Sequence, residues 1–219
     1  MIKLENYEVL GWEHAIRGMR NPMNSWEKSD SCWYPMEVAD GVGWLIGDND
    51  HELMMKLASA GPVHGKFRRM ITVYVDITAP LYWWKEFDTY KVGTVANSCS
   101  TMHKIHAKEF EFEDFSLEHL ECLPWGKGEY NFKASMYETI GDLNIARNLY
   151  LETKDKKYWW QMIQLLPTSY NQKRTVQLNY EVLAGIYQYR KNHKLDEWRE
   201  FCEWIEQLPY SEIITGERD

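Results

Sequence analysis

The chain has 219 residues, of which 26% are charged and 44% apolar, a composition typical of one globular domain with a sizeable core. Its 25 lysines and arginines against 33 aspartates and glutamates give a formal net charge of −8, which argues against binding to a nucleic acid polymer. A local basic cluster can still hold a single nucleotide. The 11 tryptophans and 14 tyrosines suit core and subunit-interface packing better than a dedicated stacking site.

The cysteines stand far apart without a CxxC pair, which predicts neither a disulfide framework nor a zinc site; they are Cys32, Cys99, Cys122 and Cys202. Reduced thiols suit a cytoplasmic protein. The N-terminal MIKLENYEVL lacks the apolar core of a signal peptide, and no run approaches the roughly 18 apolar residues that cross a membrane. We therefore expect a cytoplasmic protein without a membrane partner.

The first half of the chain predicts strands and short helices. Residues 1–10 indicate a strand, and residues 11–47 an irregular stretch. HELMMKLASAG, after Asp50, has apolar residues at helical spacing and ends at Gly61, a typical helix terminator. In residues 68–80, alternating apolar and polar residues predict a half-buried strand. Pro80 ends that strand and suits the first turn of a helix that runs without a breaker towards Gly93.

The second half predicts helices after an irregular region. Residues 96–110 show little periodicity, and the acidic residues 110–130 indicate a surface excursion. Apolar residues recur at helical spacing over 136–166, over 174–192 and over 195–208. We expect an α/β (α+β) fold with a small sheet packed with long helices and a helical C-terminal half. A single domain would span residues 1–219, with its core at about residues 48–208.

Two stretches together resemble the flavin-dependent thymidylate synthases. LLPTSYNQKRTVQLNYEVLAGIYQYR, residues 165–190, has the family's Leu-Pro pair, a following Tyr170, Asn179, and Arg190 eleven residues later. The second stretch begins at His64, where the family has a Gly-His element, and runs through ITAP into YKVGTVANSCSTMH at residues 90–103. The family signature there reads RHRxxSxNExSxRY, and Asn97 falls on its asparagine. The resemblance covers roughly residues 48 to 205.

This chain departs from the signature at most of its charged positions. Ser100 is retained, and a one-residue shift would place Lys91 on the third basic position. The replaced positions carry Tyr90, Lys91 and Val92 for Arg-His-Arg, Ser98 for Glu, Met102 and His103 for Arg-Tyr, and Ile163 for an arginine before the Leu-Pro pair. These losses remove several charge-assisted hydrogen bonds, each worth about 1.5 to 3 kcal/mol. The resemblance therefore implies altered or absent activity on the family's substrates.

The family methylates dUMP with methylene-tetrahydrofolate and reduced FAD, and its homotetramers build each active site from several subunits. By resemblance, Ser100 and Arg190 would bind the nucleotide, and His64, Lys91, Asn97 and Asn179 would bind FAD; NADPH is a further possible co-substrate. No catalytic side chain and no metal site is implied. These residues have ordinary alternatives: a solvated salt bridge for Arg190, a solvated helix end for Lys91, turn caps for the asparagines, and a place in a polar loop for Ser100.

The leading hypothesis is a flavin-dependent, thymidylate-synthase-like enzyme acting on dUMP or a related pyrimidine nucleotide. The alternatives are a non-catalytic nucleotide-binding or interaction protein that keeps the fold, and a pyrimidine base-modifying variant. Cys99 between two serines could act as a nucleophile, but a small inert thiol is the more common role. The sequence itself does not choose between the hypotheses.

Overall fold

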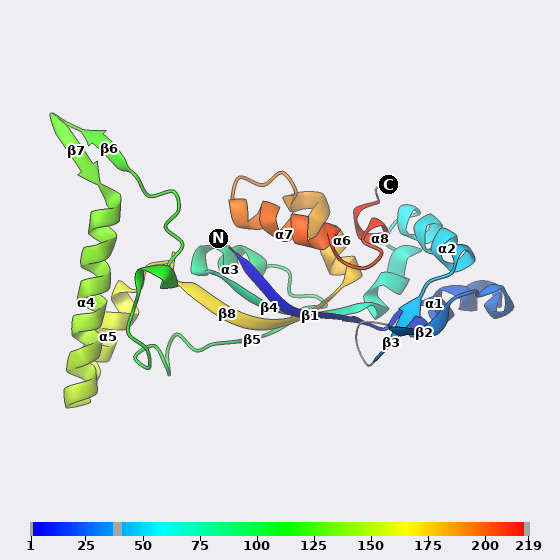
Figure 1. The fold of residues 1–219 in the computed structure, drawn as a ribbon, viewed down its shortest axis with the longest axis horizontal. Coiled ribbons are helices and arrows are strands. Elements are labelled where there is room, and N and C mark those ends of the chain that lie inside the picture. Colours follow the sequence, from blue (N-terminus) through cyan, green and yellow to red (C-terminus); the bar gives the residue numbers. More distant parts are fainter. Residues whose placement is uncertain (1, 37–40, 217–219) are drawn as a thin grey trace. The chain divides into compact units, whose positions relative to one another are not determined.

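The computed structural model describes residues 2–36 and 41–216. Figure 1 shows helices and strands along the whole described chain. In chain order they are β1 (Lys3–Leu10), α1 (Trp12–Arg20), β2 (Cys32–Met36), β3 (Gly41–Leu45), α2 (Asp48–Ser59), the 3₁₀ helix η3 (Gly65–Met70), β4 (Thr72–Pro80), α3 (Leu81–Phe87), β5 (Val95–Ser98), β6 (Cys122–Trp125), β7 (Gly128–Asn131), α4 (Phe132–Thr153), α5 (Lys156–Leu165), β8 (Asn171–Asn179), α6 (Tyr180–Arg190), α7 (Asp196–Glu206) and α8 (Glu212–Thr215).

The strands form one four-stranded sheet of order β1-β4-β8-β5 and two antiparallel hairpins, β2-β3 and β6-β7. Strand neighbours in the main sheet are far apart in sequence, so long helical excursions separate them. The mixed architecture of a small sheet with many helices confirms the predicted fold class. Among the described residues, no helix has the length and apolar character needed to cross a membrane.

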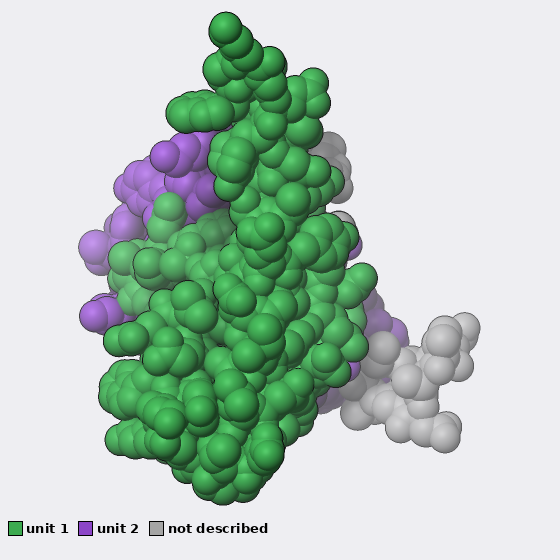
Figure 2. All heavy atoms as spheres, turned by 90° about the vertical axis from the view of Figure 1, so that its left-hand side faces the viewer, with its two compact units in different colours: residues 1–3, 77–89, 97–175 green, residues 4–76, 90–96, 176–219 purple. Residues whose placement is uncertain are grey.

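The chain divides into two compact units, coloured separately in Figure 2. Unit 1 contains residues 1–3, 77–89 and 97–175, and unit 2 contains residues 4–76, 90–96 and 176–219. Strands β4 and β8 each contain residues of both units. The segment 90–96 returns the chain briefly to unit 2 between two parts of unit 1.

In unit 2, helices α1, α2 and α6 pack against η3, and α7 and α8 pack against α6. The alternation predicted for residues 68–80 is confirmed, because Ile71, Val73 and Val75 are buried while Tyr74 is exposed. Helix α2 also matches its prediction and ends before Gly61, whose φ of 93° is the left-handed conformation that glycine adopts easily. Its third residue, Asp50, points into the protein and is fully buried.

Unit 1 is built on the antiparallel helix pair α4 and α5, which follows the hairpin β6-β7 (Figure 1). The two helices are separate because Lys154 adopts a left-handed φ of 57° and the side chain of Asp155 caps α5 through the Lys157 amide. The core beside them consists of Ile105, Phe110, Phe115, Leu117, Ile140, Leu143, Ala146 and Met162. The acidic excursion at 110–130 therefore supplies core residues as well as surface.

Three local predictions are wrong. Residues 11–47 are not irregular throughout: they contain α1 and the hairpin β2-β3, although residues 37–40 lie outside the described part. Helix α3 ends at Phe87, because the hydroxyl and amide of Thr89 both bond to the Glu86 carbonyl and turn the chain. Residues 174–179 belong to strand β8, whose buried Val176 and Leu178 alternate with exposed Gln177.

Candidate functional site

Asn179 marks the change from strand to helix in unit 2. Its backbone is extended, and its side-chain oxygen accepts the amide hydrogen of Val182 at 3.0 Å, which caps α6. The side-chain nitrogen of Asn179 lies against Gly93. A Cβ atom at Gly93 would stand 2.9 Å from that nitrogen, and φ there is 80°, so the position suits glycine alone. The capping role of Asn179, one of the two predicted alternatives, is thus present in the structure.

Arg190 ends the same helix and is held on several sides. Its Nε donates to the hydroxyl of Tyr90 at 2.9 Å, and its guanidinium lies 4.7 Å from the ring centroid of Trp198. Nη1 lies 3.0 Å from Nε2 of His193. A cation above an indole ring and bonded to a phenol is fixed in direction, so Arg190 is not a mobile surface arginine.

Arg190 and Asn179 meet the same short segment, residues 90–93. Asn179 is the extended residue that caps α6 and Arg190 is the last residue of α6, so the two stand at opposite ends of the helix. Tyr90 contacts Arg190 at one end of the segment, and Gly93 contacts Asn179 at the other. Lys91 lies between them and is exposed. The structure therefore brings three of the six predicted site residues together within unit 2.

His193 meets two donors with its two ring nitrogens. Nδ1 lies 3.2 Å from the Leu195 amide, and Nε2 faces Nη1 of Arg190. A neutral imidazole has only one nitrogen lone pair, so it cannot accept both hydrogens at once.

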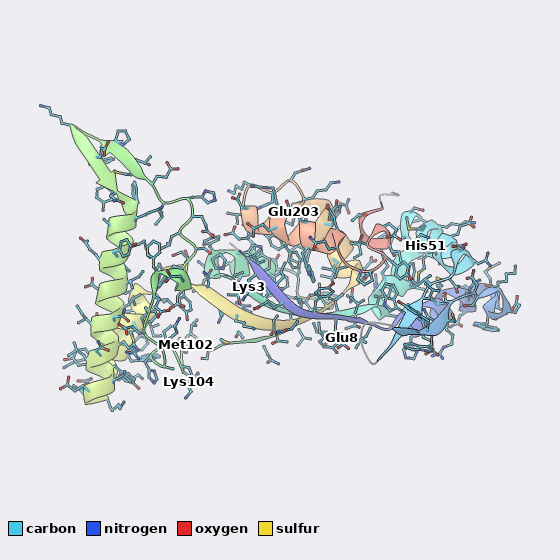
Figure 3. All side chains as sticks on the ribbon, in the orientation of Figure 1. Lys3, Glu8, His51, Met102, Lys104 and Glu203 are labelled. Carbon is cyan, nitrogen blue, oxygen red and sulfur yellow. The ribbon has the colours of Figure 1, made fainter. Side chains whose placement is uncertain are left out.

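The other predicted residues lie elsewhere. His64, also in unit 2, is exposed just before η3, with its backbone amide bonded to the Gly61 carbonyl. Asn97 and Ser100 belong to unit 1, where Asn97 lies exposed in β5. The Ser100 hydroxyl accepts the amide hydrogens of Met102 and His103 at 3.2 and 2.9 Å, in the loop after β5 (Figure 3 labels Met102). Ser100 thus caps a turn in this polar loop.

Unit 1 contains a half-buried arginine, Arg174, that the sequence did not single out. The guanidinium of Arg174 lies 4.1 Å from the ring centroid of Trp84 and donates to Asp88 at 2.7 Å and to the side chain of Gln172 at 3.0 Å. Gln172 in turn donates to the carbonyl of Cys99 at 2.7 Å. This network holds the segment after β5 against β8. A strand predicted over 171–179 would have placed Gln172 and Arg174 on one face, because side chains two residues apart in a strand point the same way.

Neither a nucleophilic cysteine nor a metal site emerges from the geometry. Burial raises the pKa of the Cys202 thiol to about 12, so it stays protonated at neutral pH. Cys99 is exposed, and its backbone groups bond to Lys173 and Gln172. Among the described residues, no group of three or more His, Cys, Asp or Glu side chains is arranged to hold a metal ion.

No family model matches the chain, and no curated protein matches its sequence. Solved structures do match its fold. A flavin-dependent thymidylate synthase from Helicobacter pylori, complexed with FAD and dUMP, has a TM-score of 0.67 at 17% identity, covering 98% of each chain. A UMP/dUMP methylase from Streptomyces cacaoi, bound with 5-Br dUMP, has a TM-score of 0.61 at 14% identity, covering 99% of this chain and 95% of the other. The fold expected from the two motif stretches is therefore confirmed.

Proposed function

We propose that this chain, which has the fold of the flavin-dependent thymidylate synthases, binds a pyrimidine nucleotide and FAD and transfers a one-carbon group to the pyrimidine base. Two observations support the proposal. The fold likeness covers nearly all of each chain, and two similar proteins were crystallised with dUMP or a brominated dUMP. The predicted ligand residues Arg190, Asn179 and Lys91 also gather along one segment of unit 2.

The position of Arg190 is the observation that carries the nucleotide part. Guanidinium hydrogens bind carbonyl and phosphate oxygens of nucleotides well, and a rigid arginine loses less entropy when it does so. Tyr90 and Trp198 provide that rigidity on two sides.

The residues of unit 2 fit a flavin nucleotide in their chemistry. The exposed ammonium group of Lys91 would pair with a phosphate, and the imidazole of exposed His64 and the side-chain nitrogen of Asn179 would hydrogen-bond to the cofactor. Bound FAD, when reduced, supplies a hydride, whereas these side chains only bind and orient. In unit 1, Asn97 and Ser100 remain proposed contacts to flavin and nucleotide. Methylene-tetrahydrofolate and NADPH are the proposed co-substrates.

Calorimetric titration of dUMP and UMP tests the role of Arg190. Changing Arg190→Ala should weaken nucleotide binding at least tenfold, because a hydrogen bond to a charged group is worth about 1.5 to 3 kcal/mol. Arg69→Ala is the matched control, since Arg69 is an exposed arginine of η3 in the same unit. Equal affinities in wild type and Arg190→Ala, with binding clearly present, would remove Arg190 from the site.

A non-catalytic nucleotide-binding protein is the second candidate. Two residues that the enzyme would need for ligands already make local hydrogen bonds, which favours this candidate. Ser100 caps a turn, and the side-chain oxygen of Asn179 caps a helix. Absorbance of the purified protein separates the two candidates. FAD that co-purifies, or that binds on titration and is reduced by NADPH, supports the enzyme. Nucleotide binding without any flavin binding supports the second candidate, and analysis of the product base would reveal a base-modifying variant.

We also propose a cytoplasmic homotetramer. Helix α4 carries a row of outward residues, Tyr137, Gly141 and Ile145, spaced one turn apart, and the side chains of Tyr137 and Ile145 are 61% and 60% exposed. A Cβ atom at Gly141 would meet nothing within 4 Å. Exposed apolar rows of this kind are typical of subunit contacts, and a glycine in the middle lets another helix approach closely.

A further inference from the structure

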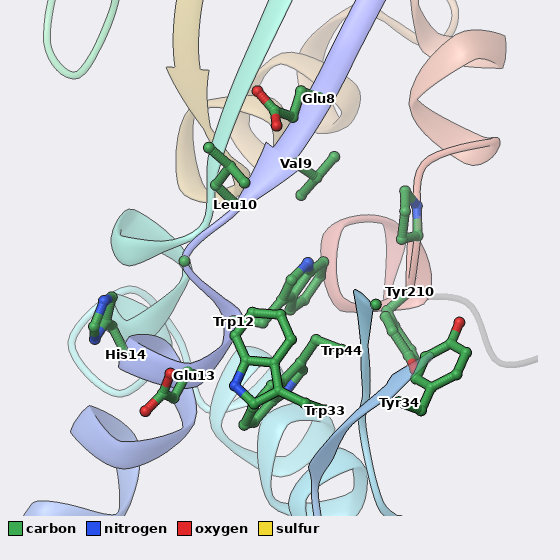
Figure 4. A pocket seen from close by; sticks show the side chains of 13 residues that line it. Glu8, Val9, Leu10, Trp12, Glu13, His14, Trp33, Tyr34, Trp44 and Tyr210 are labelled. Carbon is green, nitrogen blue, oxygen red and sulfur yellow. The ribbon is translucent and has the colours of Figure 1, made fainter. Parts of the chain in front are cut away.

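Unit 2 contains an aromatic pocket that the proposed function does not use (Figure 4). Its volume is about 540 Å³, which is the size of a small-molecule site and too large for a metal ion alone. The aromatic walls are Trp12, Trp33, Tyr34, Trp44 and Tyr210. They come from the start of α1, from both strands of the hairpin β2-β3, and from the turn before α8.

The walls of this aromatic pocket are held in place. Trp12 is 8% exposed and lies edge-on to Tyr210 at 5.4 Å between ring centroids. The Tyr210 hydroxyl accepts the amide hydrogen of Ile46 at 3.0 Å. Trp33 and Trp44 are cross-strand partners with centroids 4.9 Å apart. A pocket with preset aromatic walls loses little entropy when a ligand enters.

Gly43 positions one of the walls. It stands opposite Tyr34 in the hairpin register, and a Cβ atom at Gly43 would come within 3.0 to 3.1 Å of the Tyr34 ring. A larger residue there would push the tyrosine aside. The glycine therefore lets the Tyr34 ring lie across the hairpin, next to the pocket.

The charges around the aromatic pocket favour a cation. Its polar lining includes Glu8, Glu13 and His14, and among the described residues no lysine or arginine lines it; the cation Arg17 lies behind His14, with Nη2 3.1 Å from Nδ1 of that ring. The faces of tryptophan and tyrosine rings carry negative electrostatic potential, which attracts organic cations, above all methylated ammonium groups. Carboxylates at the same pocket add to this attraction and repel anions such as phosphates.

We propose that this aromatic pocket binds a small quaternary ammonium compound of the choline type, with its methylated cation among the rings. Choline chloride is the probe, and calorimetry and intrinsic tryptophan fluorescence on the full chain are the measurements, at constant ionic strength. The uncharged isostere 3,3-dimethylbutan-1-ol is the matched ligand control. We expect saturable choline binding at least about tenfold tighter than that of the alcohol, the range for a cation over desolvated rings.

Two variants locate the site. Trp33→Ala should weaken choline binding about tenfold without unfolding the protein, because Trp33 is 56% exposed on its hairpin. Glu13→Gln, an isosteric change at an exposed position, should weaken it severalfold. Trp125→Ala is the control, since Trp125 is also an exposed tryptophan, 75% exposed, on the other hairpin, β6-β7.

Three outcomes would overturn the proposal. Choline without a saturable signal at millimolar concentration leaves no such site. Equal affinity for choline and the uncharged alcohol shows an apolar pocket that does not select a cation. Equal losses in Trp33→Ala and Trp125→Ala place the binding outside the aromatic pocket. Unchanged thermal unfolding of each variant confirms that any loss is local.

Discussion

Asp50 in unit 2 and Ile145 in unit 1 are both found where their residue types are uncommon. The carboxylate of Asp50 is fully buried, yet it accepts hydrogen bonds from Arg20, Ser29, Ser31 and the amides of Asp30 and Ser31. Ile145 is 60% exposed on α4, so most of its side chain is not covered by other residues of unit 1. The buried charge has its partners inside its own unit, whereas the exposed apolar side chain does not.

The difference is between buried charges that are paired within unit 2 and exposed apolar side chains that are not covered within unit 1. Unit 2 satisfies its buried charges internally, and Arg68, paired with Glu181 at 2.7 Å and bonded to the Ile213 carbonyl, is a second example. The apolar row of α4 and the exposed Trp125 would be satisfied by another subunit. Changes in unit 2 should therefore affect stability first, and changes on the α4 row should affect assembly first.

The largest expected effect is the loss of the Asp50 carboxylate. Asp50→Ala leaves the buried guanidinium of Arg20 and two serine hydroxyls without their acceptor, and breaking a buried ion pair from one side costs about 3 to 5 kcal/mol. The thermal unfolding midpoint should fall by about 10 °C. Lys108→Ala, which removes an exposed ion pair with Asp114, is the control and should shift it little. Equal shifts would contradict the comparison.

Lowering the pH should destabilise the protein through the Asp50 carboxylate as well. Burial alone would raise the pKa of Asp50, but the hydrogen bonds from Ser29, Ser31 and Arg20 and the charge of Arg20 outweigh it and lower the pKa below its usual value. The stabilisation is then fully present above the unfolded-state pKa of about 3.9 and is lost as pH falls through the folded-state pKa. Unfolding midpoints measured from neutral pH down to about pH 3 should fall more steeply in wild type than in Asp50→Asn. Parallel curves would assign the acid sensitivity to other groups.

Assembly is the next effect in size. Ile145→Glu places a charge on the α4 row and should lower the mass measured by light scattering towards the 26.2 kDa of one chain, with little change in thermal unfolding of the subunit. Glu138→Ala, an exposed change elsewhere on α4, is the control and should keep the oligomer. If wild type is already a monomer, the α4 row is not a subunit contact.

The fold was predictable where a single period governs the residues. The alternation at 71–77 and the helical spacing after Asp50 reflect burial of one face, and the order of apolar and polar residues along the sequence encodes that burial. Residues 174–190 show the limit: the alternating Val176 and Leu178 also fit a helix when joined to the apolar residues of α6. Tertiary pairing with neighbouring strands decides that choice. The hairpin β2-β3 lacks the sequence signal of a two-residue turn, because more than two residues separate its end pair, Met36 and Gly41.

The site was predictable in part. Arg190 and Asn179 stand at the two ends of α6, and both contact the segment 90–93, whereas the helical spacing expected between them does not hold because Asn179 ends β8. The partners of Arg190 were not predictable, since Tyr90, His193 and Trp198 approach it from separate segments. The departure from the family signature at position 90 has a visible consequence, because the Tyr90 hydroxyl that stands there bonds to Arg190.

The smallest expected effect tests the hydrogen bond between the Tyr90 hydroxyl and Arg190. Tyr90→Phe keeps the ring beside Arg190 but removes the hydroxyl that accepts from Nε, while Trp198 still supports the guanidinium. We expect dUMP affinity to fall about threefold, the lower part of the range for one hydrogen bond, with unfolding unchanged within about 0.5 kcal/mol. In an Arg190→Ala background the same change should have no further effect, because a residue that acts only through Arg190 has nothing left to position. An equal loss in both backgrounds would mean that the Tyr90 hydroxyl contacts the nucleotide itself.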